Sequence, residues 1–360
     1  MSYEVDVLAV GQESKSGDAI AFRYGDFRQR DLFQVVVIDG GFQENGEQLV
    51  ELIRGTYGTT SVDLVVSTHP DADHSSGLRV VLEELEVREL WMHLAWNHTA
   101  EANAYRGTVL KRFDEQLEKS LATANDLETI ARRKNIPVRE PFEWVRSRDA
   151  SLVVLGPNEA YYNELVAQFE SPENAALRML PERLRTLLQK AAARLRELWD
   201  QEALVEPDPG ATRPQNNSSA IILGQLAQDT RFLFTGDAGV PALDRAVPQG
   251  RVAWARQTLR YVQVPHHGSK RNLSPTVLDR LLGPKVPPAT SAGLTAFISA
   301  AKDGEPDHPS KRVTNAAIRR GATVIATQGS SHFYKSSDRP MRPGYGPIDP
   351  ITFTESYEED

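Results

Sequence analysis

One short stretch of the chain combines residue types that bind metal ions. The sequence Ser-Thr-His-Pro-Asp-Ala-Asp-His-Ser-Ser-Gly follows the apolar run Val62–Val66. If that run is a buried strand, His69, Asp71 and Asp73 leave its end at alternate positions, where the side chains of an extended segment point to the same side. His74 directly follows Asp73 and therefore diverges from it. We predict two neighbouring ions, the first bound by His69 with Asp71. The second would be bound by Asp73 with His74.

A simpler interpretation of this stretch is a strand followed by an acidic turn that caps a helix beginning near Ser75. Such a cap requires one Asp or Ser, and it requires no histidine. Pro70 also favours the metal site, because it biases the preceding His69 towards extended geometry and so aims the imidazole forward from the strand end. Two histidines around two carboxylates are therefore better explained by metal binding.

The composition limits both the ligands and the class of protein. The chain has 360 residues, of which 40% are hydrophobic and 25% charged, and this is a normal globular mixture. It contains no cysteine, which excludes disulfides and thiolate ligands. The formal net charge of −8 argues against non-specific coating of nucleic acid by the whole surface, although a local basic strip could still face a polyanion. No apolar stretch approaches about 18 residues and the N-terminus does not resemble a signal peptide, so we expect a cytoplasmic protein without membrane contact.

The order of the predicted elements is that of an α/β protein. Short apolar runs predict strands at residues 3–10, 19–24, 32–38, 62–66, 87–92, 220–223, 231–234 and 261–264. Helical spacing covers residues 47–56 and 78–85. Because strands and helices alternate, we expect an α/β sandwich.

A block of different character lies between about residues 97 and 205. Most of it has helical spacing, although residues 144–155 are predicted to form two strands. Residues Arg183–Trp199 carry an apolar stripe opposite a row of Arg and Lys, which predicts a basic amphipathic helix. Such a helix is usually a solvated face, and the alternative is a contact surface for a nucleic-acid strand or a protein partner. The final residues 338–360 are Pro- and Gly-rich and then acidic, so we expect an extended or frayed tail.

Two later strand ends carry further candidate ligands. The run 231–234 ends at Thr235–Asp237, and the run 261–264 continues into Pro265–Ser269, which contains two adjacent histidines. A lone Gly-Asp after a strand is more often a turn than a ligand. Because ligand sites of α/β sheets lie outside the strand ends, the three motifs together predict more than each does singly.

In this order the motifs resemble the metallo-β-lactamase-like C-terminal domain of the ComEC competence proteins. The resemblance covers most of the chain outside the helical block. It is carried by Val10–Gln12, Gly17–Asp18, Val37–Gly41, Thr68–Gly77, Asn216–Ser219, Phe234–Asp237, Val264–Ser269 and His308–Ser310. The resemblance implies one domain over residues 1–360, built as a four-layer αββα sandwich with a helical insertion. It also implies a metal site between the two sheets and hydrolysis of a phosphodiester in single-stranded DNA.

The resemblance implies the same division of the first four ligands between two ions. It further implies that Asp237 bridges the ions and that His266 completes the second site. His267 is the alternative, because the sequence does not tell which ring faces the ion. Hydrolases of this fold usually supply another histidine to the first ion from the segment before the bridging Asp. Asn216 and Asn217 stand in that segment here, and no histidine does.

An amide in that place would leave the first ion held mainly by oxygen atoms, which favours Mn²⁺, with Zn²⁺ or Mg²⁺ as alternatives. Asp73 and His308 are the candidate catalytic residues, since His308 precedes a predicted helix and could protonate a leaving group. His93 and His98 lie too early in the chain to replace the missing ligand, and we expect them to be structural. Candidates for contact with the substrate are His267, Ser269, Lys270, Asn216 and Asn217.

We therefore predict a nuclease or other phosphodiesterase that uses water activated by two divalent metal ions. Its substrate would be nucleic acid or another phosphodiester, and the helical insertion could bind a protein partner. One alternative is a hydrolase of a small nucleotide or a lactone. Another is a non-catalytic binding or regulatory module with an incomplete metal site, which the missing imidazole would explain.

Overall fold

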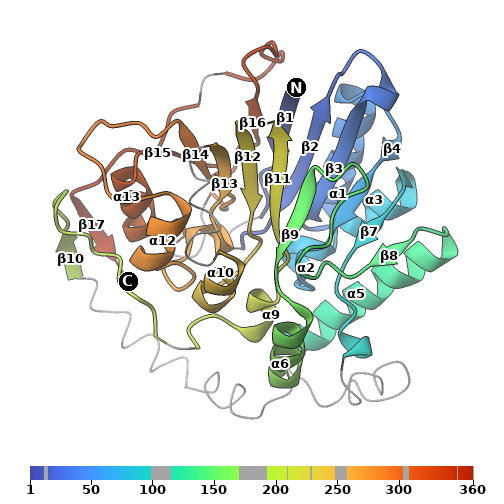
Figure 1. The fold of residues 1–360 in the computed structure, drawn as a ribbon, viewed down its shortest axis with the longest axis horizontal. Helices are drawn as coiled ribbons and strands as arrows, with labels where there is room; N and C mark the ends of the chain where they lie inside the picture. Colours follow the sequence, from blue (N-terminus) through green and yellow to red (C-terminus); the bar gives the residue numbers. More distant parts are fainter. Residues whose placement is uncertain are drawn as a thin grey trace.

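The computed structural model describes residues 1–11, 15–98, 115–169, 193–208, 210–227, 229–247, 258–302, 308–346 and 348–359. Two mixed β-sheets lie face to face in the middle of the molecule, and helices cover the outer side of each sheet (Figure 1). The predicted αββα sandwich is therefore confirmed.

The first sheet comes mainly from the N-terminal part of the chain. Its strands run in the order β16 (His332–Lys335), β1 (Ser2–Val7), β2 (Ala19–Gly25), β3 (Phe33–Gly40), β5 (Leu64–Val66), β7 (Leu90–Trp91) and β8 (Val138–Arg139). The pairs from β16 to β3 are antiparallel, and those from β3 to β8 are parallel. Beside it lie α1 (Gln43–Glu51), which continues as a π-helical turn (Leu52–Thr56), α3 (Leu78–Glu84), α5 (Glu115–Arg133) and a small parallel pair of β4 (Ser61–Val62) and β6 (Glu86–Val87).

The second sheet comes from the middle and the C-terminal part. Its order is β15 (Ala322–Ala326), β14 (Leu294–Ile298), β13 (Leu259–Gln263), β12 (Thr230–Phe234), β11 (Ile221–Ala227) and β9 (Leu152–Gly156). Strands β12 to β15 are parallel, whereas β9, β11 and β12 pair antiparallel. The helices on this side are α6 (Glu159–Phe169), α10 (Val240–Ala246), α12 (Pro275–Leu281) and α13 (Lys311–Arg319).

Strand β3 shows how one sequence serves two layers. Val35 and Val37 belong to the apolar cluster under the helices, whereas Val36 and Ile38 belong to the cluster between the sheets. Successive side chains of a strand point to opposite faces, so a strand buried on both sides must be apolar throughout. The layer between the sheets is filled mostly by aromatic and β-branched side chains, including Phe22, Trp91, Phe232, Phe234, Tyr261 and Phe297.

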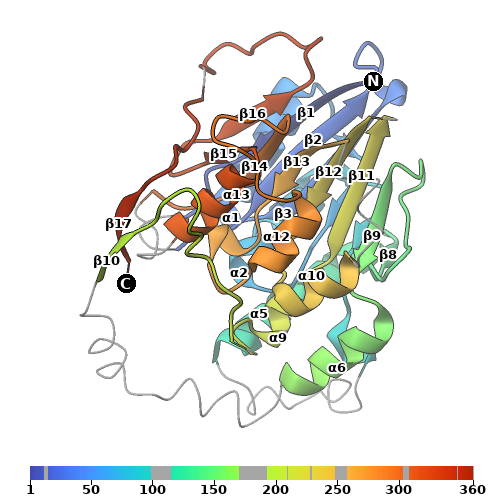
Figure 2. The same cartoon turned by 60° about the vertical axis from the view of Figure 1, so that its left-hand side comes forward.

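The basic helix predicted at residues 183–199 is wrong where the structure describes that segment. Residues 183–192 lie outside the described part, and Ala193–Arg196 form strand β10. This strand pairs antiparallel with β17 (Ser356–Glu359), so the end of the predicted frayed tail is also a strand (Figure 2). Glu197, directly after β10, is buried beside Arg319 and accepts a hydrogen bond from Asn315 Nδ2 at 3.0 Å. Tertiary contacts with a distant part of the chain outweigh the local helical spacing here.

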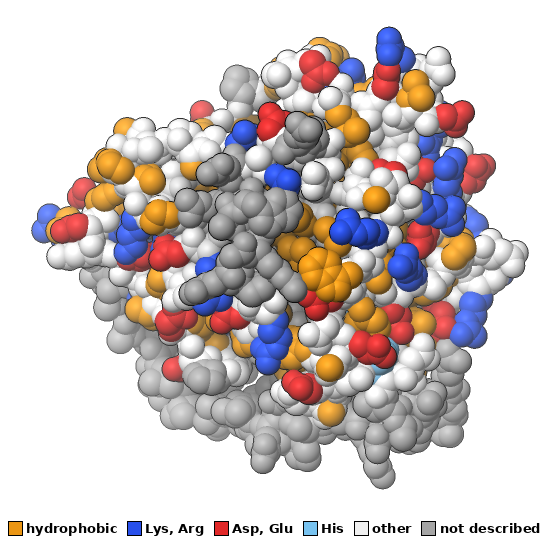
Figure 3. All heavy atoms as spheres, in the orientation of Figure 1, with side chains coloured by type: hydrophobic (Ala, Val, Ile, Leu, Met, Phe, Trp, Pro, Cys, Tyr) orange, Lys and Arg blue, Asp and Glu red, His pale blue; other side chains and the backbone are white. Residues whose placement is uncertain are grey.

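The surface follows the modest net charge of the sequence. On the face shown in Figure 3, basic and acidic side chains of the described residues are interspersed. Among the helices of the described segments, none has both the length and the apolar character needed to cross a bilayer.

Candidate metal centre

The predicted ligands meet where strands of both sheets end. In the first sheet, β3 ends at Asp39–Gly40 and β5 leads into His69, after which the short helix α2 (Ala72–Ser75) carries Asp73 and His74. In the second sheet, Asp237 lies just beyond β12, and a turn of 3₁₀ type at His266–Gly268 follows β13. Both sheets thus direct polar side chains to one region, as strand ends of α/β proteins commonly do.

A close approach between backbones fixes the loop that carries the ligands. A Cβ atom on Gly77 would lie 2.0 Å from the carbonyl oxygen of Gly40, so only glycine fits there. The Gly77 amide donates to the Gly41 carbonyl at 2.9 Å. The glycines of the two motifs therefore hold α2 against the end of β3, which brings His74 next to Asp39.

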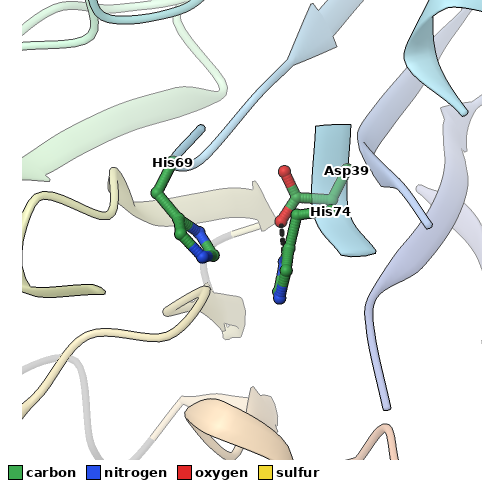
Figure 4. A group of neighbouring side chains, drawn as sticks. All are labelled: Asp39, His69 and His74. Carbon is green, nitrogen blue, oxygen red and sulfur yellow. Dashed lines mark hydrogen bonds and ion pairs between the residues drawn. The ribbon is translucent and has the colours of Figure 1, made fainter. Parts of the chain in front are cut away.

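Asp39 orients the first two histidines. It accepts hydrogen bonds from His74 Nδ1 at 2.9 Å and from Thr68 Oγ1 at 2.7 Å. Since the Thr68 hydroxyl gives its only proton to Asp39, it must accept from His69 Nδ1, which lies 3.0 Å away. Both neutral rings consequently carry their lone pair on Nε2. Figure 4 shows the two rings side by side with these ends pointing to the same side, and the ring centroids are 4.2 Å apart.

His267 is oriented in the same manner by another element. Its Nδ1 lies 2.8 Å from the carbonyl oxygen of Ser299, which directly follows β14. A carbonyl oxygen only accepts, so Nδ1 carries the proton and Nε2 is left for a metal ion. Histidines that bind metals typically have their outer nitrogen fixed by such a partner.

The histidine nitrogens and carboxylate oxygens that face the centre are all hydrogen-bond acceptors when the rings are neutral. His74 Nε2 lies 3.4 Å from Asp237 Oδ1, and His69 Nε2 lies 3.7 Å from Asp237 Oδ2. The two Nε2 atoms and Asp237 Oδ1 are buried without a hydrogen-bond partner in the described part of the chain. Unpaired buried acceptors are costly, and a cation between them removes that cost. These residues therefore fit a divalent metal ion.

The two predicted ligand sets differ in how tightly they converge. Asp73, His74 and His267 each offer a ligand atom within 4.8 Å of the others. Asp71 Oδ2 lies 3.9 Å from His69 Nε2, but within the described ranges every trio that meets the same limit includes His74. The second set is thus more compact, and the first is more open.

Burial and neighbouring charges shift the pKa values in the centre. Burial opposes protonation of His74, but Asp237 and Asp39 outweigh it and raise the pKa of this imidazole well above its usual value. Burial would raise the pKa of Asp237, yet the surrounding histidines, His74 first, hold it well below the ordinary range. Burial lowers the pKa of His267 to about 3, which keeps this ring neutral. A proton on His74 and a metal ion therefore compete for one place, so that metal binding releases a proton.

The comparisons with known proteins agree with this architecture. Residues 34–162, which span β3 to α6 and include the His-x-Asp-x-Asp-His motif, match the family model of the metallo-beta-lactamase superfamily. The chain has a metallo-β-lactamase fold. No curated protein sequence matches it.

Solved structures resemble the chain only remotely. A protein from Thermotoga maritima assigned to the metallo-β-lactamases is 10% identical, with 66% of this chain and 79% of that chain covered and a TM-score of 0.32. A diphosphatase of the PhnP family is also 10% identical, with 93% of this chain and 98% of that chain covered and a TM-score of 0.39. These values are too low to support any inference about the site.

The two asparagines predicted to contact the ion or the substrate have different surroundings. Asn216 faces the centre, with Nδ2 3.5 Å from Asp237 Oδ2. Asn217 instead joins two backbone segments, accepting from the Gly239 amide at 3.2 Å and donating to the Thr212 carbonyl at 3.4 Å. Only Asn216 is thus close enough to the carboxylate of Asp237 to affect an ion.

The residues around His266 and His267 lie at the edge of the centre. The ring of His308 lies 5.7 Å from that of His266 and 6.3 Å from that of His267, between centroids. Ser269 is buried, and its hydroxyl accepts from the Arg271 amide at 3.3 Å, so it shapes the turn. Lys270 lies on the same turn and is partly exposed.

Three residues near the metal centre were not predicted from the sequence as site residues. Asp39 was not among the predicted ligands, and only its place in the Val37–Gly41 motif indicated more. Asp18 lies 3.6 Å from His74 Nδ1, and burial raises the pKa of its carboxyl group to about 7. Ser120 on α5 donates to Asp71 Oδ1 at 3.1 Å, which no sequence signal indicated.

Proposed function

We propose that this chain is a metal-dependent hydrolase that cleaves a phosphodiester, with nucleic acid as the favoured substrate class. One observation carries the proposal: the two oxygens of the buried Asp237 carboxylate face imidazoles of different ligand sets, His74 at Oδ1 and His69 at Oδ2. A carboxylate placed in this way can bridge two ions. Two-metal centres are suited to in-line displacement at phosphorus, because they stabilise both the attacking and the leaving oxygen.

The protein supplies orientation, charge and a proton donor around that centre. Divalent ions held here would activate water near neutral pH and neutralise charge on the phosphate. Asp73 contributes a carboxylate to the compact second set, and we assign it an essential role for that reason. His308 lies on the side of His266 and His267 and is the candidate donor to the leaving oxygen. Lys270 would attract the substrate phosphate.

We favour Mn²⁺ as the metal, with Zn²⁺ or Mg²⁺ as alternatives, because the ligands combine imidazoles with several carboxylates. We also propose that residues 1–360 form a single domain, that residues 97–205 are a place for a protein partner, and that the protein acts in the cytoplasm.

The decisive experiment compares the purified protein with Asp73→Ala on single- and double-stranded DNA, RNA, a cyclic dinucleotide and a lactone. Each substrate is tested with Mn²⁺, Mg²⁺ and Zn²⁺ after chelation. Asp126→Ala is the matched control, since Asp126 is a half-exposed carboxylate on α5 that pairs only with Arg79 at 3.5 Å among the contacts described. We expect metal-dependent cleavage of a phosphodiester that Asp73→Ala loses and Asp126→Ala keeps. Equal cleavage by Asp73→Ala would refute the assignment of the site.

The same assay separates the alternatives. Cleavage of the cyclic dinucleotide or the lactone without cleavage of polymers would favour a small substrate. Absence of turnover, together with less than one bound ion per chain in excess Mn²⁺, would favour a binding or regulatory module.

A further inference from the structure

The first ion lacks one histidine compared with the pattern that the family resemblance implies, and Asn216 stands in its segment. We propose that His266 supplies this imidazole, so that the two adjacent histidines serve different ions: His266 the first and His267 the second. The inference rests on the proposed metal centre. It differs from the expectation that His266 completes the second site.

The proton on the His266 ring is located by a chain of hydrogen bonds. Asn272 Nδ2 donates to the backbone carbonyl of Asp237 at 2.9 Å. A carbonyl cannot donate, so this contact fixes which end of the Asn272 amide is nitrogen. The other end, Oδ1, lies 2.9 Å from His266 Nδ1 and accepts its proton. The lone pair of the neutral His266 ring is therefore on Nε2.

That lone pair points to the oxygen of Asp237 that belongs to the first ion. His266 Nε2 lies 3.7 Å from Asp237 Oδ2, and His69 Nε2 lies at the same distance from the same oxygen. His74, a ligand of the second ion, faces the other oxygen, Oδ1. The carboxylate of Asp237 thus divides the histidines into two groups, and His266 falls in the group of His69.

His267 belongs to the opposite group. It converges with Asp73 and His74 within 4.8 Å, whereas no trio in the described ranges at this limit contains His266. The side chain of His266 is 32% exposed, but that of His69 is fully buried. The first ion would therefore be held on the more exposed side of the centre.

The backbone explains how neighbouring residues reach two ions. His266 and His267 have φ angles of 48° and 56°, and Gly268 follows with 81°. The left-handed region is unfavourable for residues other than glycine, and such conformations cluster at active sites and ligand sites, where the surrounding structure holds them. In an extended strand the two rings would point to opposite sides, whereas here the centroids lie 5.6 Å apart with planes at 70°. The turn thus allows His266 to face Asp237 Oδ2 while His267 converges with Asp73 and His74.

Asn216 stands where the family pattern has the histidine that His266 would replace as a ligand. Its Nδ2 lies 3.5 Å from the same Asp237 oxygen, while its Oδ1 is buried without a partner. An imidazole at position 216 would therefore reach the first ion as well. This permits a test in which the imidazole is moved from one position to the other.

The experiment counts bound Mn²⁺ and Zn²⁺ by calorimetric titration and by elemental analysis after gel filtration. The variants are His266→Asn, His267→Asn, the double variant His266→Asn/Asn216→His, and the control His332→Asn. His332 bonds to the Ala326 carbonyl at 3.0 Å, and no contact with a proposed ligand is among those described. No substrate is used, so the result does not depend on whether the hydrolase activity proposed above is found. Circular dichroism and the unfolding temperature confirm that each variant is folded.

We expect two ions in the native chain and in His332→Asn. His266→Asn should bind one ion normally and the other at least about 100-fold more weakly, since even the outer partners of metal ligands contribute 10- to 100-fold. The double variant should regain tight binding of the first ion. Asp71→Asn, which also affects the first ion, should add little to the loss in His266→Asn, whereas Asp73→Asn should abolish the remaining ion.

Two results would overturn the inference. One is unchanged binding of both ions by His266→Asn. The other is that His266→Asn and His267→Asn weaken binding of the same ion. In that case adding Asp73→Asn to either variant would cause little further loss, and the double variant His266→Asn/Asn216→His would not recover binding. If His266→Asn is unfolded, His266→Gln takes its place in the same combinations, and the bound ions are counted in the same way.

Discussion

A buried histidine after β7 allows a quantitative prediction about acid stability. His93 follows β7, and its ring stacks on Tyr162 with centroids 4.2 Å apart and lies 5.0 Å from the ring of Phe142. Neither ring nitrogen has a hydrogen-bond partner in the described part of the chain. Burial, and to a lesser degree the charge of His98, lowers the pKa of His93 from 6.5 to about 3. The folded protein therefore keeps this ring neutral at pH values where the unfolded chain protonates it.

The sign and size of the effect follow from proton linkage. Between pH 6.5 and 3 the unfolded state binds more protons at His93, so the free energy of unfolding falls as the pH is lowered. At 1.36 kcal/mol for each pKa unit, the difference of about 3.5 units corresponds to a total loss of about 4 to 5 kcal/mol. Between pH 7 and pH 5 the loss from this one residue is about 2 kcal/mol. His93→Phe keeps a ring of similar shape and should remove that loss.

The assay is urea unfolding of the chelated proteins at pH 7, 6 and 5. We expect His93→Phe to lose about 2 kcal/mol less than the native chain between pH 7 and pH 5, with an unchanged dependence on urea. His98→Gln is the control of opposite sign. The hydrogen bond to Glu140 raises the pKa of His98, so its contribution is present below its ordinary pKa and is lost as the pH rises through the raised value. An equal loss in the native chain and in His93→Phe would refute the reasoning, because it would mean that the folded protein protonates His93.

Three further predictions concern the metal centre and its support. Ser120→Ala should weaken the first ion by about 10-fold and leave the second unchanged in calorimetric titration, because Ser120 orients only the Asp71 carboxylate, at 3.1 Å; an effect on the second ion instead would contradict this role. Glu197→Gln should lower the free energy of unfolding by about 3–5 kcal/mol, because it leaves the buried Arg319 without its partner charge, while the ion count stays at two; a loss below about 1 kcal/mol, which is typical of exposed pairs, would mean that the pair is solvated. Chelation should lower the unfolding temperature and Mn²⁺ should restore it, since an ion at 100 times its dissociation constant stabilises by about 2.7 kcal/mol; an unfolding temperature that does not respond to chelator or metal would contradict the proposed centre.

The sequence determined the ligands that lie close together along the chain. His69, Asp71, Asp73 and His74 fall within one loop after a strand, so their spacing alone predicts convergence. The sandwich was also predictable, because strands buried on both faces must be apolar throughout and helices must present an apolar stripe. These properties depend on short-range order, which a sequence displays directly.

Only the tertiary structure decided the roles of residues that meet from distant segments. Adjacent histidines at 266 and 267 look equivalent in sequence, and they differ because Asn272 fixes one ring and the Ser299 carbonyl fixes the other. Asp39 became an orienting carboxylate only when Gly77 let α2 approach the end of β3.

The segment at β10 shows the same limit for secondary structure. Ala193–Arg196 have spacing that suits a helix, yet they pair with β17 from the other end of the chain. Local periodicity records which face of a segment is apolar, but it does not record which partner is available. The hydrogen bonds to that partner, and the burial of Glu197 beside Arg319, are long-range terms that exist only in the folded chain.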